Sequence, residues 1–236
     1  MIIGLDFILT SNSENIFRFL SGNLFFQYID CIGLSFPFIT LFILRKQIEF
    51  LQKNMVILFY VIFFSLSIVA TFSRSIFNIS NLVFYNLIPI LLLVPMHFFF
   101  KSHLTSLFWK RFLNTIIFLF FIYFLMSSNQ ISSLLNSYYY LIFSFYIMLG
   151  SFIYLLEELN FISSRSPKLK IEFWFIVCLF FYASNCLLVW SLYDWLAFSL
   201  NDSNNVSIVW SSLHNSALFI HCIIFSIALI WNRHRI

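Results

Sequence analysis

Seven mainly apolar stretches divide the chain, and each is about as long as a helix that crosses a bilayer. They are residues 24–44, 55–73, 82–100, 108–126, 137–156, 173–193 and 207–231. A transmembrane helix needs about 20 predominantly apolar residues to cross about 30 Å of hydrocarbon. The runs are continuous rather than alternating, which argues against a membrane β-barrel. The sequence therefore predicts an all-α, polytopic transmembrane bundle of seven helices.

The composition supports the same class of protein. Hydrophobic residues make up 61% of the 236 residues and charged residues only 9%, whereas a soluble domain carries about 25% charged residues. A soluble protein of this composition could not cover its apolar surface with polar groups. Soluble, disordered and nucleic-acid-binding proteins are therefore excluded as classes.

The basic residues are distributed asymmetrically between the two ends of the predicted spans. Eleven of the thirteen lie in the loops 45–54, 101–111 and 157–172 or in the C-terminal tail, and only Arg18 and Arg74 lie on the other side. Cytoplasmic loops carry an excess of Lys and Arg. We therefore expect the N-terminus outside and the C-terminus in the cytoplasm, which requires an odd number of spans.

The predicted organisation leaves little chain outside the membrane. Residues 1–23 form an extracytoplasmic segment in which residues 13–22 could lie as an interfacial helix, residues 24–231 form the membrane domain, and residues 232–236 form a short basic tail. The N-terminus lacks the basic region of a signal peptide. All four cysteines fall in apolar stretches, which is typical of packing residues rather than of a disulfide framework.

Four polar side chains in the outer half of the predicted spans form the candidate site, which consists of Asp30, Asn185, His214 and Asn215. Asp30, His214 and Asn185 lie at depths of about 9, 10 and 12 Å below the outer ends of their helices. Ionisable groups inside a membrane are costly and often functional. If the first, sixth and seventh spans are neighbours, these groups could line a pocket open to the outside. The alternative is a set of interhelical hydrogen bonds that only hold the bundle together.

The sequence gives weaker support for a haem site or a protease active site. His221 shares a helix face with His214, but a pair of haem-binding histidines at matched depth is missing. Gly33-Leu34-Ser35 fits a rhomboid-type Gly-Xaa-Ser pattern with His214 as base, and Glu157-Glu158 is similar to the glutamate pair of CAAX-type membrane proteases. Both lack their supporting motifs. We therefore expect no enzyme activity, no metal and no cofactor.

The C-terminal half has a recognisable sequence pattern. It contains Tyr138-Tyr139-Tyr140, Phe173-Trp174, Tyr182 and Trp210-Ser211-Ser212-Leu213-His214-Asn215. This pattern resembles the seven-helix membrane proteins and the membrane input domains of histidine kinases that are common in Bacteroidota. The resemblance implies a seven-helix architecture and a role in signalling. Members fused to a kinase continue past the last helix, whereas this sequence ends at Ile236.

These observations lead to one expected function and two alternatives. We expect an integral sensor or signalling subunit of the bacterial cytoplasmic (inner) membrane, without an output domain of its own. Its partners would be the lipid bilayer and a separate histidine kinase or another subunit of a membrane complex, and not nucleic acid. An accessory structural subunit of a larger membrane complex is the first alternative. A small transporter is the second, although the third to fifth spans offer few polar residues beyond Ser and Asn.

Overall fold

The structure is a computed structural model, and it describes residues 24–44, 50–77, 81–130, 136–160, 171–200 and 203–232. Over these ranges all of its regular secondary structure is helical. Its α-helices are α2 (Leu24–Ile43), α3 (Phe50–Phe77), α4 (Leu82–His103), α5 (Leu107–Ser127), α6 (Ser137–Asn160), α7 (Ile171–Leu200) and α8 (Ser203–Asn232). The single-turn 3-10 helix η1 (Ser128–Gln130) follows α5. The predicted segment 1–23, the tail after Asn232 and most of the basic loop residues lie outside the described residues.

The seven predicted spans correspond one to one with the seven described α-helices, which confirms the all-α transmembrane prediction. Six of these helices are long and apolar enough to cross a membrane, and within α2 the stretch Ile29–Ile43 is a shorter apolar helix. In hydrocarbon, a helix satisfies its backbone hydrogen bonds within one segment. Apolar runs of this length therefore fold as helices even though they are rich in Phe and Ile.

The helices extend further than the predicted spans. The predicted spans 173–193 and 207–231 leave residues 194–206 between them as a loop. In the structure α7 continues to Leu200 and α8 begins at Ser203, so most of that range is helical. Asp194 ends the apolar run without ending the helix, because an acidic residue has no steric effect on helical backbone. Hydropathy therefore located the part of each helix that fits the membrane and underestimated the helix itself.

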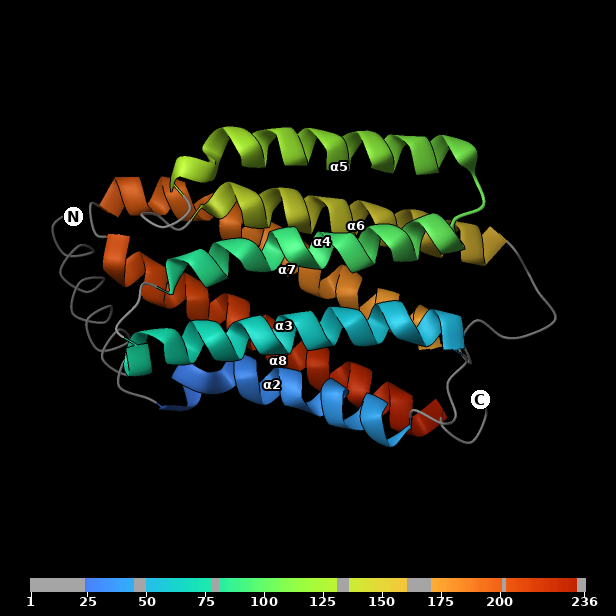
Figure 1. The fold of residues 1–236 in the computed structure, drawn as a ribbon, viewed down its shortest axis with the longest axis horizontal. Helices are drawn as coiled ribbons and strands as arrows, with labels where there is room; N and C mark the ends of the chain where they lie inside the picture. The colour runs from blue at the N-terminus through green and yellow to red at the C-terminus, as the bar shows by residue number, and fades with distance from the viewer. Residues whose placement is uncertain are drawn as a thin grey trace, which may run out of the picture.

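Six of the helices form a closed ring, and the seventh lies outside it. Around the ring, α2 packs on α3, α3 on α4, α4 on α6, α6 on α7, α7 on α8, and α8 on α2. Helix α5 contacts only α4 and α6 among its larger interfaces and forms the outer edge of the bundle (Figure 1). Helix α2 begins at one end of the bundle and α8 finishes at the other, as an odd number of spans requires (Figure 1).

Aromatic rings fill the centre of the ring of helices. Phe175 of α7 is fully buried, and its ring lies 5.6 Å from each of the rings of Phe59 of α3, Phe99 of α4 and Phe225 of α8. One side chain therefore contacts three other helices. Close packing is also enforced at Gly150 of α6, where an added methyl group would come within 2.5 Å of the buried Phe100 ring of α4.

Candidate functional site

His214 of α8 lies at the centre of a hydrogen-bonded group in the interior of the bundle. Trp190 Nε1 donates to His214 Nδ1 over 3.2 Å, and the Cys186 thiol lies 3.2 Å from the same nitrogen. The Tyr182 hydroxyl lies 3.2 Å from His214 Nε2. The three partners are spaced four residues apart on α7 and therefore share one face of that helix. We call His214 and these three residues the His214 group.

The partners of His214 determine its tautomer. The indole N–H of Trp190 can only donate, so Nδ1 is an acceptor and carries no hydrogen. The proton of the neutral ring is then on Nε2, which donates to the Tyr182 oxygen. The Tyr182 hydroxyl is left free to donate, and the Cys186 sulfur lies within its reach. Each polar atom of the His214 group thus has a role in one connected arrangement.

Tyr140 of α6 extends the His214 group towards a third and a fourth helix. Its ring stacks on the Trp190 indole with a centroid distance of 4.6 Å and meets His214 edge-on at 5.6 Å. Its hydroxyl donates to the backbone carbonyl of Tyr85 in α4 over 2.8 Å. A helix carbonyl accepts this extra bond without losing its own, so Tyr140 connects α4, α6, α7 and α8.

Asp30 of α2 lies near this arrangement but is not bonded to His214. Its side chain is buried, and Oδ1 accepts a hydrogen bond of 2.8 Å from the backbone N–H of Cys31. It is close enough to Tyr85 and Tyr140 to interact with both electrostatically. Asp30 and His214 thus both lie near the same tyrosine, Tyr140.

The two predicted asparagines are placed differently from Asp30 and His214. Asn185 is exposed on the outer face of α7, and Asn215 is partly buried on α8 next to His214. Neither side chain has a hydrogen bond among the described residues. The structure therefore brings Asp30 and His214 towards Tyr140 and turns Asn185 away from the interior.

A second buried histidine lies one heptad further along α8. His221 Nε2 is 2.8 Å from the Tyr60 hydroxyl of α3. Its Nδ1 is buried and has no hydrogen-bond partner among the described residues. The Tyr182 ring lies between the histidines, with centroid distances of 5.6 Å to His214 and 5.5 Å to His221. A column of polar aromatic side chains thus runs along the bundle axis from Trp190 to Tyr60.

The other residues singled out for chemistry have separate partners. His97 Nδ1 is 2.9 Å from the Tyr146 hydroxyl. The Ser35 hydroxyl donates to the Ile32 carbonyl over 2.6 Å, so it is not joined to His214. Within the described part of the chain, no three His, Cys, Asp or Glu side chains gather in a way that could hold a metal ion.

Glu157 at the end of α6 holds the beginning of α5. Its carboxylate accepts hydrogen bonds from the backbone N–H of Thr105 at 2.6 Å, from the Thr105 hydroxyl at 2.9 Å and from the backbone N–H of Ser106 at 3.2 Å. Helix N-termini have unpaired N–H groups and a partial positive charge, both of which favour a carboxylate. The first glutamate of the Glu157-Glu158 pair therefore caps the peripheral helix α5.

Replacing Glu157 with alanine is expected to loosen the connection between α4 and α5. Loss of a charged N-terminal cap costs about 1 kcal/mol, which raises the population of a locally opened state about 5-fold. Tryptic cleavage at Lys101 and Lys110 in detergent should accelerate by the same factor. Glu157→Gln retains an acceptor oxygen and should show a smaller increase. Equal cleavage rates in Glu157→Ala and in the unmodified protein would contradict the capping role.

The aromatic partners of His214 were not identified from the sequence as site residues. The predicted spans count Trp, Cys and Tyr among their hydrophobic residues, so Trp190, Cys186 and Tyr140 do not stand out within them. The available signal was the spacing of Tyr182, Cys186 and Trp190, which places them on one face of a helix opposite a histidine. No family of known proteins, no characterised protein and no solved structure matches this chain.

Proposed function

We propose that the protein is a signalling subunit of the bacterial cytoplasmic membrane, with its N-terminus outside and its C-terminus inside. In this proposal a stimulus in the outer half of the membrane alters the packing of α7 and α8, and a separate partner reads the change at the cytoplasmic side. The bundle of membrane-spanning helices supports the membrane location. The resemblance to histidine-kinase input domains supports the signalling role.

The His214 group is the observation that carries this proposal. Apolar side chains slide past one another in small steps, whereas a hydrogen-bonded group has a few discrete arrangements. A switch requires such an element with two states. His214 is bonded to three side chains of α7, so a change in its bonding alters how α7 and α8 pack. Asp30 and Tyr140 lie next to this group and connect it to α2, α4 and α6.

The aromatic interior argues against the transporter, which is one of the two alternative functions. A small transporter needs a continuous polar path through the bundle, but the centre of the ring of helices is occupied by Phe59, Phe99, Phe175 and Phe225. An accessory structural subunit remains the competing function, because it requires only a stable bundle and a partner.

The proposal is tested by identifying what the protein binds in its own membrane. The tagged chain is photo-crosslinked in cells through a probe between α6 and α7, in residues 161–170, purified in mild detergent and analysed by mass spectrometry. We expect a histidine kinase or another signalling protein, and we expect His214→Gln to change the yield of that crosslink. A fixed-stoichiometry complex without a signalling component would support the structural alternative. Recovery of no partner would overturn the proposed function.

A further inference from the structure

Asn185 is a polar side chain in an unfavourable place. It is exposed on α7, within the membrane-crossing stretch Ile171–Tyr193. It lies three residues from the middle of that stretch, or about 4.5 Å along the helix axis. The nearest charged residue in its helix, Asp194, is nine residues away in the sequence, or about 13 Å. An Asn side chain is too short to reach the interface from this depth.

The other amides in or beside the described spans differ from Asn185 in burial, in bonding or in depth. Asn215 has no side-chain hydrogen bond among the described residues either, but it is partly buried and lies three residues from the start of the stretch Ser212–Trp231. Asn86 Oδ1 accepts a bond of 2.9 Å from the Asn136 backbone N–H, and the Asn136 side chain bonds to Tyr123. Asn114 of α5 is exposed like Asn185, but it is only one turn from Arg111 and so lies close to the charged end of its helix. An amide without a partner in hydrocarbon is costly. Asn185 therefore indicates a surface that is covered in the membrane.

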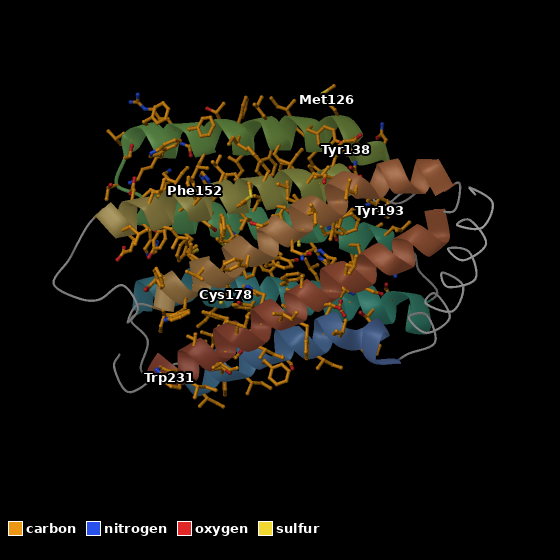
Figure 2. The ribbon with its side chains drawn as sticks, turned by 180° about the vertical axis from the view of Figure 1, so that it is seen from behind. Met126, Tyr138, Phe152, Cys178, Tyr193 and Trp231 are labelled. Carbon is orange, nitrogen blue, oxygen red and sulfur yellow. The ribbon has the colours of Figure 1, made fainter. Side chains whose placement is uncertain are left out.

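The neighbours of Asn185 form a seam suited to packing against another helix. Phe181, Leu188 and Leu192 are 69%, 63% and 41% exposed, and with Asn185 they follow a spacing of four, three and four residues. This is the heptad spacing of helix–helix seams, in which a single Asn commonly sets the register and the number of chains. Figure 2 shows α7 crossing the face seen from behind, between the labelled Cys178 and Tyr193, with no helix in front of it.

The chemistry of an amide favours a second copy of this chain as the occupant of the seam. An Asn side chain has both donors and an acceptor, so two of them satisfy each other across a two-fold axis. All copies insert with the same orientation, and this places Asn185 of each copy at the same depth. A two-fold interface then brings identical residues face to face. An unrelated partner would need a polar group of its own at that depth.

We propose that the chain forms a parallel two-fold dimer through the exposed seam of α7, defined by Phe181, Asn185, Leu188 and Leu192, with Asn185 paired to Asn185 of the second copy. This dimer does not depend on the proposed signalling function. It gives the bundle a symmetric interface on the same helix that carries the partners of His214.

Single-molecule photobleaching of the GFP-tagged full chain in liposomes tests the dimer. The fraction of two-step traces is measured as protein is diluted in lipid, with Asn114→Leu as the matched control. We expect the unmodified protein to dimerise and Asn185→Leu to shift the midpoint to a protein density about 5-fold higher or more, the effect of one interhelical hydrogen bond in a membrane. Asn185→Gln, which keeps the amide, should stay close to the unmodified protein, and Asn114→Leu should have no effect.

Three results would overturn the proposed dimer. They are a monomer at every protein density, an unchanged midpoint in Asn185→Leu, and an equal shift in Asn114→Leu. Circular dichroism of each variant confirms that the bundle is folded, which Asn185→Leu should preserve because the side chain is outside the core. The assay contains no signalling partner, so its failure is distinguishable from failure of the proposed function.

Discussion

His214→Ala is expected to lower the free energy of unfolding of the bundle by about 3 kcal/mol. The substitution leaves the Trp190 indole N–H and the Tyr182 hydroxyl without their partner in the interior. An interhelical hydrogen bond in a membrane contributes about 1 kcal/mol, and the cavity left by the imidazole adds about 1 kcal/mol more. The measurement is denaturation in mixed micelles, followed by tryptophan fluorescence, to which Trp190 contributes.

His103→Ala is the matched control, because it removes an imidazole that lies outside the His214 group. Within the described part of the chain, the hydrogen bonds of His103 at the end of α4 go to Ser102 and to the Phe99 carbonyl in its own helix, so His103→Ala should cost less than 1 kcal/mol. An equal loss in both variants would contradict a special role for the His214 group.

A second variant at the same position separates stability from signalling. The amide of His214→Gln can still accept one hydrogen bond and donate another, so it should recover part of the lost stability. If His214→Gln folds but crosslinks its partner with altered yield, the His214 group does more than hold helices together. If stability and crosslinking recover in parallel, the group is an interhelical clamp, as the alternative interpretation of the polar cluster states.

The seven spans were predictable because the physical requirement for crossing a bilayer is local. A run of about 20 apolar residues specifies a helix whatever its neighbours are. The ends of the helices were less predictable. Helices α7 and α8 continue through most of the expected 194–206 loop, since a helix does not stop where the hydrocarbon stops.

The direction in which each side chain points could not be read from the sequence. Asn185 and Cys186 are consecutive and lie about 100° apart around α7, yet one is exposed and the other touches His214. An amphipathic helix reveals its inner face through its polar residues. Helix α7 has apolar residues on all sides. The sequence therefore predicts how deep Asn185 lies in the membrane, but not the direction in which its side chain points.

The identification of Asp30 and His214 came from their ionisable chemistry, which is unusual in a span. Their environment depends on aromatic residues that contribute both apolar area and one polar atom. Tyr140 shows why the arrangement was hidden: it stacks on Trp190, donates to the Tyr85 carbonyl and lies near Asp30. Four helices, α2, α4, α6 and α7, must be placed before these contacts exist.

Phe175→Ala is the other substitution with a large expected effect, because this ring occupies the centre of the bundle. It is fully buried and contacts Phe59, Phe99 and Phe225 from three different helices. In a soluble protein, removing such a ring costs about 3–5 kcal/mol, of which part is the transfer of the ring from water. Lipid tails are as apolar as a protein core, so separated helices in a membrane expose no ring to water.

Only the packing part of that cost applies here, and we therefore expect Phe175→Ala to destabilise the bundle by about 2 kcal/mol. Phe152 of α6, labelled in Figure 2, is 49% exposed. Its ring makes fewer protein contacts than the Phe175 ring, so Phe152→Ala should be nearly neutral. Denaturation of both variants in mixed micelles measures the difference. Equal destabilisation would mean that the aromatic centre does not hold the ring of helices together, and that its stability resides in the hydrogen bonds around His214.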